Sequence, residues 1–95
     1  MKQSAIKTID VDTRTWFDKV NGNTYFAQEI TINYGMKNAV KLYNPFQYGY
    51  SSYGYEAFKF LQETFKWKKS LHERIIGGKI IVREHLQRGC KKKEL

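Results

Sequence analysis

The dipeptide Asn21-Gly22 is the feature that most constrains what this chain can fold into. Both residue types accept positive φ angles, which a type I′ turn requires at its two central positions, and such turns join neighbouring antiparallel strands. Aromatic pairs at residues 16–17 and 25–26 flank the dipeptide. Aromatic side chains favour strands, so the sequence predicts a β-hairpin at this point.

Further strands are predicted on both sides of this turn. Residues 5–11 alternate loosely in polarity and are expected to form an edge strand, with residues 13–17 continuing extended. The returning strand is predicted over residues 24–33. Its apolar face carries Phe26, Gln28, Ile30 and Ile32.

A short third strand is expected over residues 39–43, after a turn at residues 34–38. Its inner face would carry Val40 and Leu42. Pro45 is predicted to end this strand, because proline has no N–H to donate to a neighbouring strand.

Beyond the third strand the apolar spacing changes from two to about 3.6 residues, which indicates a helix over about residues 54–68. Its apolar stripe consists of Tyr55, Phe58, Leu61 and Phe65. Gly49 and Gly54 are expected to relieve crowding where the chain passes from strand to helix.

Residues 71–95 allow two interpretations. The first is a hairpin about Gly77-Gly78, and the second is a loop that leads into one strand over residues 79–86. The single strand is favoured, because only Ile75 and Ile76 stand before the glycines to make a first strand.

Together these elements predict a small α+β protein, in which an antiparallel β-meander packs against one amphipathic helix and a further strand follows. The order is β-β-β-α-β, with an additional N-terminal edge strand as the alternative. The chain of 95 residues is expected to form one domain, residues 1–95, with a basic tail at about 88–95.

The location of the protein is predicted from three sequence features. Cys90 is the single cysteine, the first residues lack the apolar segment of a secretory signal, and no apolar run approaches membrane-spanning length. We therefore expect a cytoplasmic protein with no membrane partner.

The charge of the chain points to an anionic partner. The net charge is +8, and residues 56–95 hold 11 of the 17 basic residues against five of the nine acidic ones. Nucleic acid, an anionic membrane surface or an acidic protein would each suit this asymmetry, and a solubilising surface is the alternative. The basic residues assigned to a nucleic-acid site are Lys59, Lys66, Lys68, Lys69, Arg74, Lys79, Arg83, Arg88, Lys91, Lys92 and Lys93.

Residues 46–55, FQYGYSSYGY, are the segment richest in aromatic side chains. Exposed aromatic rings beside lysines hold single-stranded bases by stacking, but a small domain also needs large side chains for its core. Core packing is favoured for Phe46 and Phe58. The tyrosines expected to be exposed, and assigned to stacking, are Tyr48, Tyr50 and Tyr53.

Metal and catalytic patterns are weak. The spacing of His72, His85 and Cys90 matches no zinc site. A set of acidic residues could gather a magnesium ion, but Asp18 is better placed to cap the hairpin turn. That set is Asp10, Asp12, Asp18 and Glu29. The sequence therefore predicts no enzyme, no cofactor and no catalytic residue.

The string TWFDKVNGNTYF at residues 15–26 resembles the core motif of a set of small proteins from bacteriophages and mobile elements. In that set the motif precedes a strand and a Tyr-Gly-rich segment, which here is residues 46–50. The basic ending, residues 90–95, is also similar. The resemblance implies a viral setting and supplies no mechanism and no functional residue.

These observations lead to three hypotheses of different classes. The first is a non-enzymatic nucleic-acid-binding protein that uses lysine and arginine contacts to phosphate with added tyrosine stacking. The alternative is a phage-encoded inhibitor that docks on an acidic host or defence protein. The third is a structural or assembly component with a free edge strand.

Overall fold

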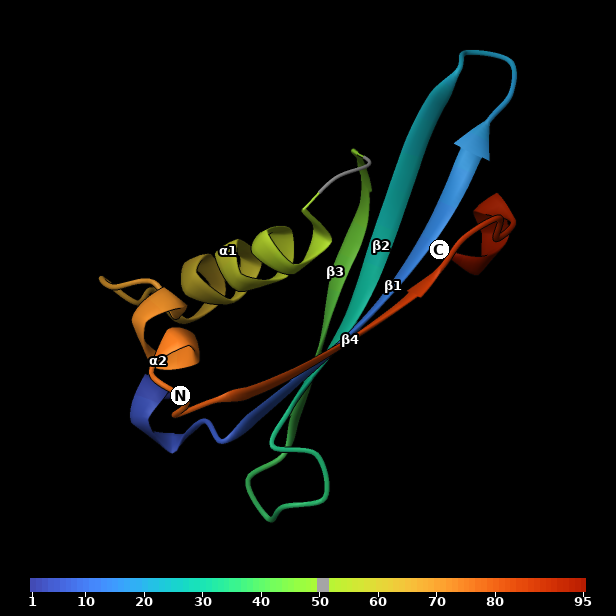
Figure 1. Ribbon diagram of the computed structural model, residues 1–95. Helices are drawn as coiled ribbons and strands as arrows, with labels where there is room; N and C mark the ends of the chain where they lie inside the picture. Colours follow the sequence, from blue (N-terminus) through green and yellow to red (C-terminus); the bar gives the residue numbers. More distant parts are fainter. Residues whose placement is uncertain (50–51) are drawn as a thin grey trace.

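The computed structural model describes residues 1–49 and 52–95 (Figure 1). Four strands form one mixed sheet in the order β3-β2-β1-β4, and this arrangement confirms the predicted α+β class with a meander, one main helix and a C-terminal strand. The elements are η1 (Gln3–Ala5), β1 (Thr8–Asp18), β2 (Asn23–Ile32), β3 (Val40–Tyr48), α1 (Tyr53–Phe65), α2 (His72–Ile76), β4 (Ile81–Gln87) and η2 (Lys92–Glu94).

Strand β1 is central, so the prediction of an edge strand at residues 5–11 was wrong. Antiparallel pairing with β2 covers one side of β1, from Ile9 opposite Ile32 to Asp18 opposite Asn23. Strand β4 covers the other side in parallel, because the two helices carry the chain across the sheet from β3 at one edge to β4 at the opposite edge.

The hairpin between β1 and β2 is confirmed, but its turn is wider than a two-residue type I′ turn. Four residues, 19–22, connect the strands, and of these only Gly22 has a positive φ, at 70°. The Gly22 N–H donates to the Asp18 carbonyl at 2.7 Å. The Asp18 carboxylate accepts hydrogen bonds from the backbone of Val20 and Asn21 and from the Asn21 side chain, so it caps the loop as expected.

Strand β3 continues past Pro45 to Tyr48, contrary to the prediction that proline would end it. A bulge makes this possible: Asn44 pairs with Gln28 and Gln47 with Phe26, which leaves two residues of β3 opposite one of β2. Because β3 is an edge strand with a bulge, the missing proline N–H breaks no required pairing.

The hydrophobic core lies between α1 and one face of the sheet. Alternate residues of β1 and β2 supply the sheet side, and Ala57 and Leu61 supply the helix side. The buried core residues are Ile6, Ile9, Val11, Ile30, Ile32, Ala57, Leu61, Leu71 and Ile80. Tyr55, expected on the apolar stripe, is 64% exposed, because the helix turns the small Ala57 toward the sheet.

The region after α1 contains a short helix, α2, that the sequence pattern did not predict. No hairpin forms about Gly77-Gly78, and the favoured single strand is confirmed as β4, Ile81–Gln87. Leu71 and Ile80, at the two ends of this connection, are buried in the core. Within the described residues, no helix combines the length and the apolar character needed to cross a bilayer.

Candidate nucleic-acid interface

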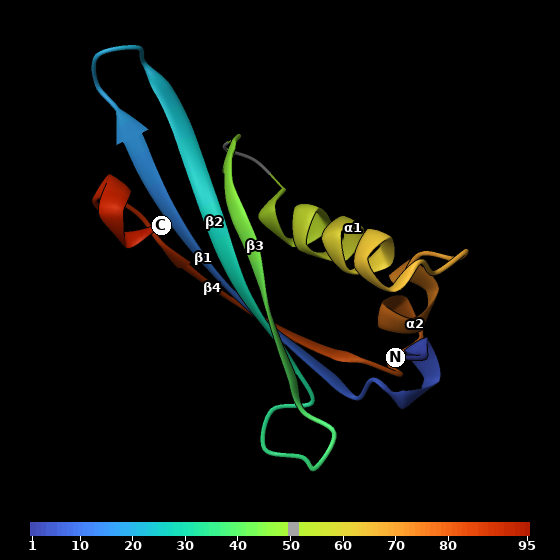
Figure 2. The same cartoon turned by 180° about the vertical axis from the view of Figure 1, so that it is seen from behind.

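One face of the sheet is covered by α-helices, and the other face carries no α-helix. Figures 1 and 2 show α1 and α2 together on one side, and the C-terminal η2 segment on the other. We call the second side the open face. Strand β1 projects Asp10, Asp12, Arg14 and Trp16 to this side, because their neighbours Ile9, Val11, Thr13 and Thr15 are buried under the helix layer.

An aromatic cluster occupies one end of the open face, across β1, β2 and β3. The Tyr25 ring stacks on Phe46 with centroids 4.9 Å apart and an interplanar angle of 11°, and it stacks on Trp16 at 5.6 Å. Tyr48 meets Tyr25 edge-on at 5.7 Å. Cross-strand pairing of Trp16 with Tyr25 and of Tyr25 with Tyr48 places these rings side by side. We call Trp16, Tyr25, Phe46 and Tyr48 the aromatic cluster.

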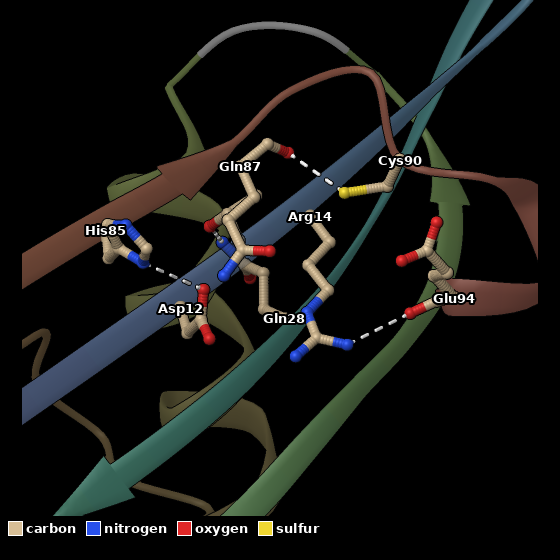
Figure 3. A network of polar contacts seen from close by, with 8 residues as sticks. Asp12, Arg14, Gln28, His85, Gln87, Cys90 and Glu94 are labelled. Atoms are coloured by element: carbon tan, nitrogen blue, oxygen red, sulfur yellow. Dashed lines mark hydrogen bonds and ion pairs between the residues drawn. The ribbon is translucent and has the colours of Figure 1, made fainter.

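The C-terminal segment brings positive charge to this cluster. The Lys92 ammonium lies 5.5 Å from the centre of the Trp16 ring, within the range of a cation–π contact. The Arg14 guanidinium donates to the Glu94 carbonyl at 3.3 Å (Figure 3). The Lys91 N–H donates to the Glu94 carboxylate at 2.7 Å.

The opposite end of the open face carries paired charges around a hollow of about 310 Å³. The Arg83 Nε lies 2.7 Å from the Asp10 carboxylate, and the Lys41 ammonium contacts Glu29. The Nδ1 of His85 lies 3.5 Å from the Asp12 carboxylate (Figure 3). Asp10, Asp12 and Glu29 therefore each have a basic side chain beside them.

Of the aromatic residues considered from the sequence, Tyr48 is exposed as predicted, at 61%. Phe46 was expected inward, yet it is 40% exposed in the aromatic cluster, because the bulge in β3 turns it to the open face. Tyr53, expected to be exposed, is half-buried on the covered face, where its ring meets Phe26 edge-on and burial raises the pKa of its hydroxyl. The prediction for Tyr50 lies outside the described residues.

The basic residues assigned from the sequence do not form one surface. Arg88 borders a hollow on the covered face with Thr15 and Tyr53, and Arg83 is paired with Asp10. The segment Lys91–Lys93 lies at the open face. The remaining six belong to the helix layer and the turns beside it: Lys59, Lys66, Lys68, Lys69, Arg74 and Lys79.

The acidic residues considered for a metal site are spread along β1 and β2. Asp10, Asp12 and Glu29 share the open face, whereas Asp18 caps the hairpin loop. Across residues 1–49 and 52–95, no group of three or more His, Cys, Asp and Glu side chains is placed to hold a metal ion.

Comparison with known proteins finds no family model, no curated protein and no solved structure that matches this chain.

Trp16, Tyr25 and Arg14 were not among the binding residues predicted from the sequence. One available signal was the alternation in β1. Every second residue from Ile9 to Thr15 is apolar or β-branched, and the residues that follow them are charged or, at Trp16, aromatic. Combined with the hairpin register, this alternation puts Trp16 opposite Tyr25 on the polar side of the sheet.

Proposed function

We propose that the protein binds single-stranded nucleic acid on the open face of its sheet and catalyses no reaction. The observation that carries this proposal is the aromatic cluster, a contiguous set of rings on a sheet face that no α-helix covers. Unpaired bases have free π-faces and stack on such rings with about 1–3 kcal/mol each. Bases within a duplex are already stacked on one another, which favours a single strand as the ligand.

Two members of the cluster are open to a ligand. Phe46 and Tyr48 project from the edge strand β3 and are the most exposed of the four rings. Trp16 and Tyr25 are half-buried and stack directly against Phe46 or against each other. They would therefore hold the exposed rings in place while bases stack on Phe46 and Tyr48.

Phosphate groups would be held by the basic residues next to the cluster. Lys91, Lys92 and Lys93 provide three positive charges within one turn of chain, and Arg14 lies on the strand beneath. At the other end of the face, Arg83 neutralises Asp10 and Lys41 neutralises Glu29, so these two carboxylates oppose a polyanion only weakly. Asp12 has the imidazole of His85 beside it. Phosphate contacts need charge along a path and no exact geometry.

The first test measures fluorescence anisotropy of labelled single-stranded oligonucleotides with the wild type and a double variant, Phe46→Ala with Tyr48→Ala. Loss of two stacking rings should weaken binding at least about tenfold. The matched control is Tyr34→Ala, which removes a tyrosine that is 72% exposed in the turn after β2, away from the aromatic cluster. Equal affinity of the double variant and the wild type would overturn the stacking role.

The second test compares two variants with the same change of charge. Replacing Lys91, Lys92 and Lys93 by alanine should lower the slope of log affinity against log salt by up to about 2, at about 0.7 for each phosphate that the variant no longer neutralises. Replacing Lys66, Lys68 and Lys69 by alanine removes three charges from the other side of the molecule and should change the slope less. A larger change of slope for the second variant than for the first would place the binding site on the helix layer. No binding by the wild type at low salt would remove the proposal.

A further inference from the structure

A second surface lies on the other side of the molecule, between α1 and α2. The two helices enclose a groove of about 360 Å³. It is lined by Tyr55, Phe58, Lys59, Gln62, Ser70, His72 and Ile75. We call this the interhelical groove. Its volume falls within the range of pockets that accept a small ligand or the anchor side chains of a peptide.

The floor of the interhelical groove is apolar. Phe58 and Ile75 are half-buried there and also pack against the hydrophobic core, so the floor rests on the rigid part of the domain. Tyr55 also lines the groove and is 64% exposed. Ile76, which follows Ile75 at the end of α2, is 71% exposed. Apolar side chains clustered at the surface mark sites of protein contact.

The surroundings of the groove are basic. Lys59 and His72 line it, and Lys68 and Lys69 directly precede the lining residue Ser70. Within the part of the chain that the structure describes, none of the six basic residues of the helix layer forms an ion pair. The same stretch, residues 53–80, contains three carboxylates, Glu56, Glu63 and Glu73, against those six positive charges.

We propose that the interhelical groove is the docking site for an acidic peptide segment of a partner protein, with an apolar side chain inserted as an anchor. The basic surroundings are complementary to Asp and Glu residues that flank the anchor. A single-stranded nucleic acid would gain charge contacts here and one stack on the exposed Tyr55 ring, but nothing from Ile75. An apolar anchor buries against Tyr55, Phe58 and Ile75 together, which favours the peptide. The inference is independent of the nucleic-acid site, because the two surfaces share no residue.

The groove is tested by selecting peptides from a random displayed 12-residue library on the immobilised full chain. We expect the enriched peptides to combine an aromatic or large aliphatic residue with several Asp or Glu residues. An enriched peptide, made and labelled, should lose about tenfold or more in affinity for Tyr55→Ala, and its binding to the wild type should weaken as salt is added. Tyr34→Ala, with a tyrosine of similar exposure in another part of the fold, should bind like the wild type.

Three results would overturn the proposal. The first is a selection that yields no common acidic-apolar pattern, and the second is an enriched peptide that binds Tyr55→Ala as tightly as the wild type. The third is displacement of the peptide by a single-stranded oligonucleotide whose own binding is lost when Lys66, Lys68 and Lys69 are replaced by alanine. That third result would assign the helix layer to nucleic acid. Loss of oligonucleotide binding at the open face alone would refute the nucleic-acid proposal and would leave the peptide proposal standing.

Discussion

At the scale of single residues, Asp18 shows how one side chain shapes the hairpin. Its carboxylate accepts three hydrogen bonds within the loop, two from backbone N–H groups and one from the Asn21 side chain at 2.8 Å. These bonds favour the charged form, and the one from the Asn21 side chain does most to lower the pKa of Asp18 below its ordinary value of 3.8.

This lowered pKa predicts an acid-dependent stability. A carboxyl group with a lower pKa in the folded than in the unfolded state stabilises the fold above its unfolded pKa, and that contribution disappears as the pH falls through the folded pKa. Asn21→Ala should move the pKa of Asp18 back toward 3.8, which NMR titration of the carboxyl carbon measures directly. The difference in unfolding free energy between wild type and variant should shrink from pH 6 to pH 2. An unchanged titration of Asp18 would contradict this account.

Gln28 is a second residue that stabilises the fold through hydrogen bonds. Its side chain is fully buried on the covered face. Its amide nitrogen donates to the Thr13 hydroxyl at 3.1 Å and to the Tyr53 carbonyl at 2.7 Å, and its oxygen accepts from Asn44 at 2.8 Å. Gln28→Leu would leave these buried partners unsatisfied and should lower the unfolding free energy by about 1–3 kcal/mol in chemical denaturation. Gln87→Leu on the edge strand β4 is the control and should change it by less than about 0.5 kcal/mol.

At the scale of elements, the passage from β3 to α1 depends on one glycine more than on the other. Gly49 has a φ of 151°, and a Cβ added to it would lie 3.0 Å from the buried Phe26 ring. A Cβ on Gly54 would meet the Glu84 carboxylate at 2.5 Å, but that group ends an exposed side chain that can turn away. The two glycines, expected from the sequence to serve one purpose, therefore differ in how far they tolerate substitution.

The corresponding prediction compares the two alanine variants by chemical denaturation. Gly49→Ala should destabilise the domain by about 1–3 kcal/mol, because an unusual backbone conformation and a contact with a packed ring are both affected. Gly54→Ala should change stability by less than about 0.5 kcal/mol, because alanine suits the helix and Glu84 can move. Equal destabilisation by the two variants would mean that Glu84 is held in place near the start of α1.

At the scale of the whole molecule, the sheet separates two surfaces of different character. Helices α1 and α2 cover one face and the C-terminal segment lies on the other (Figures 1 and 2). The aromatic cluster and Lys92 belong to the open face, and the interhelical groove belongs to the helix layer. The chain measures 44 × 25 × 21 Å along its principal axes. Electrostatic influence between exposed charges decays over about 8 Å at physiological salt, so the two surfaces should act almost independently.

The independence of the open face and the interhelical groove leads to a prediction for the complete domain. A saturating single-stranded oligonucleotide should change the affinity of a groove-selected acidic peptide by less than about twofold at physiological salt, as measured by anisotropy of the labelled peptide. A ternary complex should therefore form and appear in size-exclusion chromatography. Strong mutual exclusion would show that both ligands use one surface, and it would refute the separation of the two sites.

The sequence by itself determined the local structure of this protein. The hairpin at Asn21-Gly22, the alternation in β2 and the helix around Leu61 were all predictable, because hydrogen-bonding pattern and side-chain period are properties of neighbouring residues. The turn type was not, because a four-residue loop closed by the Gly22-to-Asp18 backbone hydrogen bond competes with the two-residue type I′ turn that Asn21-Gly22 favours.

The tertiary structure alone decided which surfaces exist. Periodicity shows that a strand has two faces, but it does not show which face a helix will cover or which strand will pair across the molecule. Here the crossover through α1 and α2 places β4 beside β1, makes β1 central and directs the C-terminal lysines to the open face. This pairing of β4 with β1 also divides the positive charges, which lie together in the sequence, between two opposite sides of the sheet.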